Sequence, residues 1–199
     1  MEPSEETQRP TPDTQALFER RAATTRVDDI ALDQAQRNVI RSIAVRARRP
    51  ADAAGPGAAS RHAPAQSGVT ALFVGSDRVA RENAAAALAN ELGVDVYRVD
   101  LGKLVSKYIG ETEKNLRRVF AAAEEAGAVL LFDEADALFG KRTDVKDAHD
   151  RYANIEVGHL LERLESFTGV AILATNTKSN IDPAFVRRIR YIVDLPNVR

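Results

Sequence analysis

The sequence predicts an α/β fold built on a parallel sheet. Two observations carry this prediction: short apolar runs rich in Val, Ile and Leu recur from residue 69 onward, and most are followed by a segment with the charge pattern of a helix. Alternating strands and helices favour parallel pairing, with helices covering both faces of the sheet. In such sheets the functional residues lie beyond the carboxyl ends of the strands.

The part of the chain before the first predicted strand is less regular. Residues 1–25 mix Pro, Thr, Glu, Gln and Arg without periodicity, and we expect a disordered tail. From Asp29 to Arg48 apolar residues recur at helical spacing, which predicts a helix that ends before Pro50. Residues 51–68 are rich in Ala, Gly, Pro and Ser and predict a flexible loop. We therefore expect one globular core over residues 26–199.

The regular part of the chain is predicted to alternate between strands and helices. Each strand is a short apolar run, and each helix carries its charges on one side. The predicted strands are 69–74, 95–101, 128–133, 170–175 and 190–195. The predicted helices are 80–92, 112–125, 147–167 and 182–188. The strands fit into one parallel sheet.

Composition limits the classes of protein to which the chain can belong. It has 199 residues, 44% of them hydrophobic and 29% charged, which is typical of a globular domain with its own core. The formal net charge of -1 indicates neither a nucleic acid nor an anionic membrane as partner. There is no cysteine, so thiolate metal sites are excluded. The polar N-terminus and the lack of a long apolar run predict a cytoplasmic protein without a membrane span.

Two adjacent carboxylates end one of the predicted strands. An apolar run, Val129 to Phe132, leads directly into Asp133 and Glu134. Buried carboxylates are costly unless a cation or a reaction uses them. In a nucleotide site Asp133 would hold Mg²⁺ through water, and Glu134 would orient and deprotonate the attacking water. A solvated pair at a strand end is the alternative, and the preceding apolar run disfavours it.

Polar and basic residues follow the next strand. Strand 170–175 is followed by Asn176, whose amide could reach a terminal phosphate, although Asn after a strand is commonly a turn residue. Arg188 and Arg190 lie just before the last predicted strand. They form either a basic surface cluster or an arginine finger, a guanidinium that crosses a subunit boundary to stabilise transition-state charge.

Together these motifs resemble the large α/β subdomain of the AAA family of ATPases, over about Val27 to Leu195. DEAD at 133–136 looks like the Walker B element, ATN at 174–176 like sensor 1, and SKYIGETEKNLRRVF at 106–120 like the pore-loop segment. The resemblance implies a three-layer sandwich of the P-loop NTPase type, with the five strands in the order 5-1-4-3-2. It also implies ATP and Mg²⁺ as cofactors.

The resemblance further implies partners. These are neighbouring AAA subunits in a ring, hexameric in the family, and a polypeptide client. Tyr108 and Ile109 would form the tip that grips the client, and an ordinary loop aromatic is the alternative for Tyr108. The family's helical lid is expected to be missing beyond the last strand.

The phosphate loop departs from the family pattern, which reads G-x-x-x-x-G-K-S/T. In that pattern backbone amides wrap the phosphates, the lysine neutralises them and the hydroxyl binds Mg²⁺. The positions that would surround the nucleotide are Gly75, Ser76, Asp77, Arg78, Val79, Ala80, Arg81 and Glu82. Ala80 adds a methyl group, and Arg81 replaces a compact ammonium by a planar fork.

Glu82 is the most damaging of these changes, because it removes a Mg²⁺ ligand and places a carboxylate beside the phosphates. At about 4 Å and an effective dielectric of about 20, the repulsion is roughly 4 kcal/mol. That corresponds to about a thousandfold weaker binding. In the first turn of helix 80–92, Glu82 would instead stabilise the helix N-terminus in place of phosphate.

Two functions remain open. The first is an AAA-type ATPase that couples ATP binding and hydrolysis to protein remodelling, impaired here by the loop so that hydrolysis by this chain alone is weak or absent. The second is a pseudo-ATPase, an assembly module that donates Arg188 or Arg190 to an active neighbour. The retained Glu134 favours the first, and the altered loop favours the second. A DNA-handling relative is disfavoured by the net charge of -1 and by the pore-loop resemblance.

Overall fold

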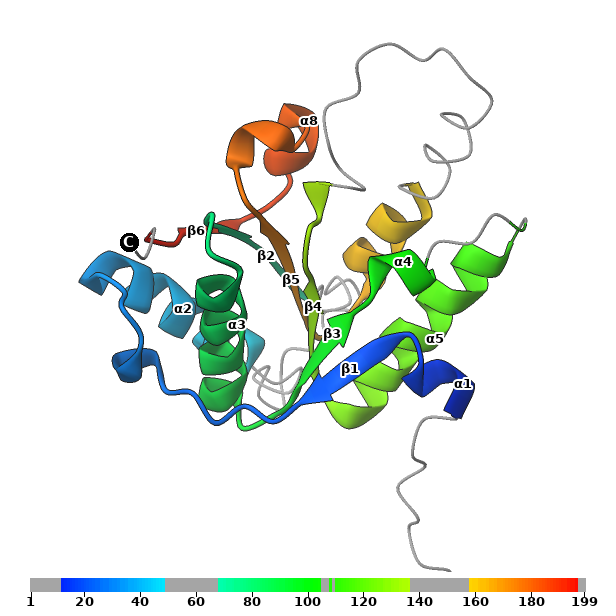
Figure 1. Cartoon of the computed structure of the whole chain (residues 1–199), viewed down its shortest axis with the longest axis horizontal. Helices are drawn as coiled ribbons and strands as arrows, with labels where there is room; N and C mark the ends of the chain where they lie inside the picture. Colours follow the sequence, from blue (N-terminus) through cyan, green and yellow to red (C-terminus); the bar gives the residue numbers. More distant parts are fainter. Residues whose placement is uncertain (1–11, 49–67, 105–107, 109, 137–157, 197–199) are drawn as a thin grey trace, which may run out of the picture.

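A six-stranded sheet forms the middle layer of the molecule, and helices cover both of its faces (Figure 1). The computed structural model describes residues 12–48, 68–104, 108, 110–136 and 158–196. No helix in these ranges is long and apolar enough to cross a membrane. The predicted three-layer α/β sandwich is confirmed.

The strand order in the sheet is β1-β3-β4-β5-β2-β6. The strands are β1 (Phe18–Arg21), β2 (Val69–Val74), β3 (Val96–Val99), β4 (Val129–Phe132), β5 (Val170–Thr175) and β6 (Tyr191–Asp194). All neighbours from β3 to β6 pair in parallel. The order predicted for these five parallel strands, 5-1-4-3-2, is therefore confirmed.

The sixth strand corrects the prediction of a disordered tail over residues 1–25. Residues 12–25 are ordered, with helix α1 (Pro12–Gln15) and strand β1, which pairs antiparallel with β3. Phe18 of β1 stacks on Tyr97 with their ring centroids 4.3 Å apart. A four-residue edge strand needs only this one apolar anchor, so no periodic pattern marks it in the sequence. Residues 1–11 lie outside the described ranges.

Each predicted helix has a counterpart in the predicted order with different ends, and the four-residue helices α1 and α4 were not predicted. The helices after α1 are α2 (Gln34–Ala47), α3 (Arg78–Leu92), α4 (Leu101–Leu104), α5 (Glu111–Ala126), residues 158–166 and α8 (Pro183–Val186). Helix α2 begins later than Asp29, because Asp33 and Gln36 form a capping box that sets its first turn. Residues 147–157 of one predicted helix, and 51–67 of the predicted loop, lie outside the described residues.

The side chains of the central strands alternate between two hydrophobic cores. On one face Phe73 and Ile172 pack against Ile40 and Ile43 of α2 and Leu88 of α3, and all five are fully buried. On the opposite face the sheet packs against α5 and the helix over residues 158–166. Burial on both faces explains why the strands read as continuous apolar runs.

Close backbone packing at the start of β2 provides a test of this architecture. A Cβ atom on Gly68 would lie 2.2 Å from the carbonyl oxygen of Gly169 and 2.4 Å from that of Phe167. We expect Gly68→Ala to lower the free energy of unfolding by about 1–3 kcal/mol, because neither backbone can move away freely. Urea unfolding measures the change. Gly158→Ala is the matched control, since its Cβ would meet none of the described residues within 4 Å.

Candidate functional site

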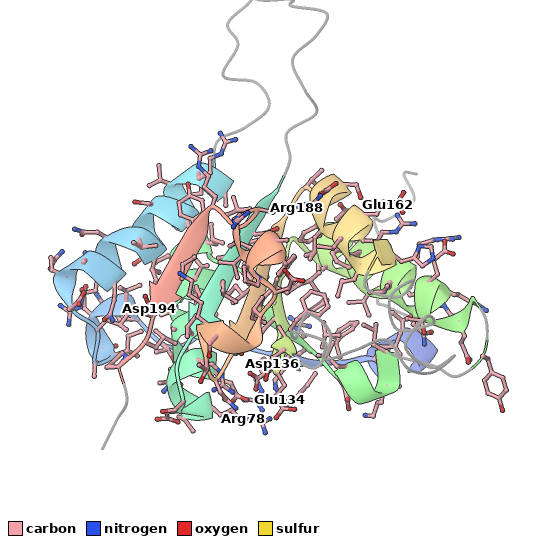
Figure 2. The ribbon with its side chains drawn as sticks, turned by 90° about the horizontal axis from the view of Figure 1, so that it is seen from above. Arg78, Glu134, Asp136, Glu162, Arg188 and Asp194 are labelled. Carbon is pink, nitrogen blue, oxygen red and sulfur yellow. The ribbon has the colours of Figure 1, made fainter. Side chains whose placement is uncertain are left out.

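Three residues of the predicted site lie where neighbouring parallel strands end. Gly75 follows β2, Asp133 follows β4 and Asn176 follows β5. Because β5 lies between β4 and β2 in the sheet, the three positions form one continuous edge. Figure 2 shows the labelled residues Arg78, Glu134 and Asp136 gathered in this region. The predicted Walker B and sensor 1 residues are therefore brought together with the altered phosphate loop.

The Arg81 side chain joins these three positions. Its Nε and Nη2 donate to Asp133 Oδ1 at 3.1 and 3.0 Å. Its Nη1 donates to Asn176 Oδ1 and to the carbonyl oxygen of Gly75, both at 2.6 Å. Arg81 is the largest fully buried side chain of the described residues, with 2% of its surface exposed. The guanidinium thus ties the ends of three strands together from within.

Asp133 is enclosed by a second arginine. Its side chain is only 4% exposed, and its Oδ2 lies 3.4 Å from Arg78 Nε. Oδ2 has no hydrogen-bond partner among the described residues. A carboxylate at this depth requires compensation by opposite charge. Arg81 supplies most of that compensation through two hydrogen bonds, and Arg78 adds a longer ion contact.

Glu82 occupies a different place from the one predicted. Helix α3 begins at Arg78, so Glu82 is its fifth residue and lies beyond the first turn. Its carboxylate binds Arg21 Nη1 at 2.7 Å and Arg78 Nε at 2.9 Å, and lies 3.3 Å from Arg98 Nε. The expectation that Glu82 stabilises the helix N-terminus is wrong. The carboxylate instead neutralises arginines that come from β1, α3 and β3.

The helix N-terminus is capped by another residue of the loop. Asp77 is the N-cap of α3, and its side chain accepts a hydrogen bond of 2.8 Å from Val79 N. Free amides at a helix N-terminus are what a phosphate would bind. Asp77 uses one of these amides and places its own negative charge there. This cap also explains why the helix starts two residues earlier than predicted.

The described residues do not fit a bound Mg²⁺ and nucleotide in this arrangement. Position 82 offers no hydroxyl, and the carboxylate of Asp133 already binds Arg81. A divalent ion about 4 Å from a guanidinium would be repelled by roughly 8 kcal/mol at an effective dielectric of about 20. Among the described residues, no three carboxylate or histidine side chains converge to hold an ion. A phosphate would also meet the carboxylate of Asp77 at the helix N-terminus.

Glu134 stands apart from this buried network. It is exposed and has a φ of 56°, the one residue other than glycine with positive φ in the described part of the chain. Such a conformation costs about 1–2 kcal/mol in a residue with a Cβ. The next residue, Ala135, donates its N–H to the carbonyl of Ala174 on β5 at 2.9 Å, which fixes the turn. The role predicted for Glu134, activation of water, stays a prediction.

Electrostatics link Glu134 to the network through Arg78. The pKa of Arg78 is raised above its usual value, first by the hydrogen bond to Glu82 and then by the charges of Glu82, Asp133 and Glu134. Thr175, which ends β5, donates its hydroxyl to Asp136 at 3.1 Å. Asp133 and Asp136 are thus both bound by basic or hydroxyl groups of the same chain.

The remaining candidate residues lie elsewhere. Arg188 and Arg190 precede the amino end of β6, so the length of the sheet separates them from the phosphate loop, as Figure 2 shows for Arg188 and Arg78. Tyr108 lies between α4 and α5, with 67% of its surface exposed. Ile109 lies outside the described residues. The structure brings neither the arginines nor Tyr108 to the phosphate loop of the same chain.

Comparison with protein families identifies the relationship. Residues 71–197 match the model of the ATPase family associated with various cellular activities (AAA). The chain belongs to the AAA family. The match includes the altered phosphate loop, Asp133, Asn176 and the arginines before β6. Membership implies nucleotide and Mg²⁺ use in the family at large.

Curated AAA relatives are identical to this chain at about a third of the aligned positions. The AAA family ATPase y4kL of Sinorhizobium fredii is 37% identical over 119 residues, which is 59% of this chain and 36% of the relative. The proteasome-activating nucleotidase of Aeropyrum pernix is 36% identical, over 56% of this chain and 29% of the relative. The 26S proteasome regulatory subunit 6B homolog of Schizosaccharomyces pombe is 34% identical, over 57% of this chain and 31% of the relative. The chain thus spans about a third of the length of these relatives.

A solved structure supports the fold. A chain in the structure of the E. coli MS115-1 HORMA:CdnC:Trip13 complex superposes with a TM-score of 0.64, over 95% of this chain and 73% of that one. The two are 19% identical, so the similarity shows a shared fold.

Two residues of the network were missed by the sequence analysis. Arg21 and Arg98 contact Glu82 from β1 and β3. Arg98 alternates in β3 with the buried Tyr97 and Val99, a signal that its side chain points to the opposite face of the sheet from these two. Arg21 gave no such signal, since its strand was not predicted. The one signal in the sequence was Glu82 itself, because a carboxylate in a phosphate loop is expected to need basic partners.

Proposed function

We propose that this chain is an AAA module that does not turn over ATP and acts by assembling with other AAA subunits. One observation carries the proposal: the buried Arg81 guanidinium joins Asp133, Asn176 and Gly75, the positions where the family handles metal and phosphate. Nucleotide would have to break these contacts before it could bind. The module therefore keeps one arrangement of its loop whether or not ATP is present.

Three charged residues of the loop support this proposal as a set. Arg81 compensates Asp133, Asp77 caps α3, and Glu82 compensates three arginines. Each charged group thus has a partner inside the chain. A loop that had merely lost its lysine would leave Asp133 buried without compensation, which is strongly destabilising.

The relatives suggest what the module assembles with. Their names describe a proteasome-activating nucleotidase and a proteasome regulatory subunit, so a ring of AAA subunits acting on a polypeptide client is the proposed setting. The exposed Tyr108 would contact the client in such a ring. In the pseudo-ATPase alternative Arg188 or Arg190 also acts as a finger toward an active neighbour. Arg188 would first have to leave Glu165, which it binds at 3.1 Å.

Calorimetry with Mg-ATP tests the proposed function directly. We expect no binding to the chain at about 1 mM nucleotide, and no release of phosphate. Light scattering coupled to gel filtration should give the same particle mass with and without Mg-ATP, because the loop does not respond to nucleotide. Micromolar affinity, or a particle mass that changes with ATP, would contradict the proposal.

A further inference from the structure

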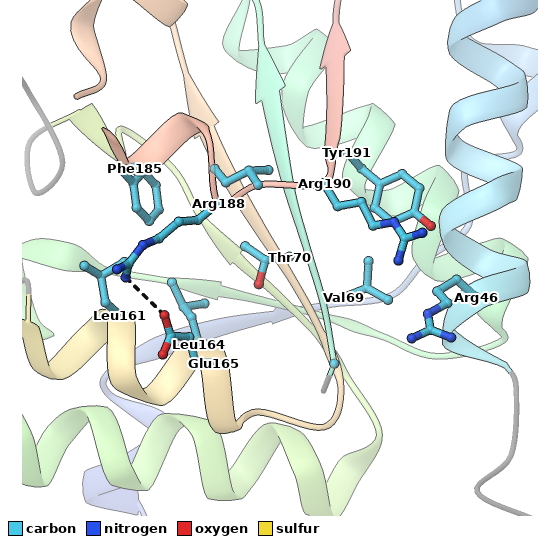
Figure 3. Close-up of a pocket in the computed structure, with 12 residues that line it drawn as sticks. Arg46, Val69, Thr70, Leu161, Leu164, Glu165, Phe185, Arg188, Arg190 and Tyr191 are labelled. Atoms are coloured by element: carbon cyan, nitrogen blue, oxygen red, sulfur yellow. Dashed lines mark hydrogen bonds and ion pairs between the residues drawn. The ribbon is translucent and has the colours of Figure 1, made fainter. Parts of the chain in front are cut away.

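A pocket lies at the opposite edge of the sheet from Arg81. Its volume is about 260 Å³, and it opens between the end of α2, the amino ends of β2 and β6, and the helix over residues 158–166 (Figure 3). None of the residues in the Arg81 network lines it. An occupant of this pocket would therefore contact none of the residues in the Arg81 network.

The rim of the pocket is positively charged. Arg46, Arg188 and Arg190 line it together with one acidic residue, Glu165, which gives a net formal charge of +2. Figure 3 shows Arg46 and Arg190 on one side and the Arg188–Glu165 pair on the other. Within the described residues, Arg46 and Arg190 form no ion pair. Arg190 lies 6.0 Å from the ring centroid of Tyr191, which leaves its hydrogen-bond donors available.

The interior of the pocket is largely apolar. Leu161, Leu164 and Phe185 form an apolar wall on one side (Figure 3), and Val69 and Ile189 also line the pocket. The hydroxyl of Thr70 also faces the pocket (Figure 3). An occupant must therefore combine a large apolar group with acidic groups close to it.

The volume distinguishes between kinds of occupant. Sites for drug-sized molecules and cofactors have volumes of about 300–1,000 Å³. This pocket is smaller than that, and suits one large side chain with a short length of backbone. Apolar anchors surrounded by complementary charges are a common mode of peptide recognition. The apolar wall and basic rim match such a segment in both size and charge.

We infer that this pocket binds a polypeptide segment of a partner protein, in which a Leu or Phe side chain is flanked by Asp or Glu residues. The apolar side chain packs against Leu164, Phe185 and Ile189. The flanking carboxylates bind Arg46 and Arg190, and a backbone group bonds the Thr70 hydroxyl. Arg188 stays with Glu165 and closes the far side of the pocket.

Fluorescence anisotropy with a labelled peptide tests this inference. The probe is Asp-Glu-Leu-Phe-Glu-Asp. One control peptide replaces Leu-Phe by Ser-Ser, and the other replaces every acidic residue by Lys. We expect the probe to bind with a Kd of roughly 0.1 mM, and both control peptides to bind at least about tenfold more weakly. Binding should weaken as salt is raised, because the rim charges are exposed.

Charge reversal identifies the site. The double variant Arg46→Glu/Arg190→Glu should weaken probe binding about tenfold or more. Arg187→Glu is the matched control, since Arg187 is exposed and adjacent in sequence but does not line the pocket. Circular dichroism and urea unfolding confirm that each variant is folded, and all three substituted side chains are exposed.

Three results would overturn the inference. One is the absence of probe binding at about 1 mM peptide. Another is equal weakening by Arg187→Glu and by the double variant, which would indicate nonspecific attraction to positive charge. The third is displacement of the probe by inorganic phosphate or ATP, which would assign these arginines to a phosphate ligand. None of these results depends on whether the phosphate loop binds nucleotide, so the test is separate from that of the proposed function.

Discussion

Restoring the family residues at positions 80 to 82 is expected to increase the affinity for Mg-ATP by about a thousandfold. In the triple variant Ala80→Gly/Arg81→Lys/Glu82→Thr, the guanidinium no longer binds Asp133 and Asn176, and a hydroxyl is available for the ion. Removal of Glu82 also leaves Arg21, Arg78 and Arg98 without their shared carboxylate. These arginines then add positive charge beside the phosphates.

Calorimetry on the single variant Glu82→Thr separates the two physical causes. If repulsion by Glu82 alone prevents binding, this variant should bind nearly as well as the triple variant. We expect it to remain close to the wild-type chain, because Arg81 still occupies Asp133 and Asn176. Chelation of Mg²⁺ with EDTA should abolish the affinity gained by the triple variant. A folded triple variant that binds no better than the wild-type chain would show that the loop substitutions do not close the site.

Replacing Arg81 alone should destabilise the protein strongly. Arg81→Met keeps much of the side-chain volume but leaves the carboxylate of Asp133 buried with only the longer contact to Arg78. Breaking a buried pair in this way costs about 3–5 kcal/mol. Urea unfolding followed by circular dichroism measures the loss. Arg117→Met, which removes an exposed pair with Glu113, is the matched control and should cost at most about 1 kcal/mol.

A second substitution shows whether the loss comes from the uncompensated charge. The double variant Arg81→Met/Asp133→Leu should recover most of the stability, because it removes both charges and fills the space with apolar atoms. If the double variant is as unstable as Arg81→Met, packing around position 81 and not the charge of Asp133 is responsible. If Arg81→Met is as stable as the Arg117 control, the guanidinium does not hold the strand ends together.

The parts of the fold that the sequence predicted are those determined by local patterns. Strands such as Val129–Phe132 and Val170–Thr175 are continuous apolar runs, because both faces of each are buried. The strand β1 escaped prediction, because four residues with one buried side chain leave no pattern. Its position depends on pairing with β3 and on the stacking of Phe18 on Tyr97, which are contacts between distant segments.

By itself the sequence determined the family, the order of the parallel strands, and the identity of the residues at the strand ends. Asp133 and Asn176 could be assigned to one edge because parallel strands deliver their carboxyl ends together. It also showed that the phosphate loop departs from the family pattern at Ala80, Arg81 and Glu82.

Only the tertiary structure decided what those departures do. From the sequence, Glu82 was interpreted as a negative charge that repels phosphate. In the fold its carboxylate is shared by Arg21, Arg78 and Arg98. From the sequence, Arg81 was interpreted as a bulky replacement for the family's lysine. In the fold its guanidinium binds Asp133, which is 52 residues away in the sequence. The pairing of charges depends on distances across the sheet, and sequence separation carries no information about those distances.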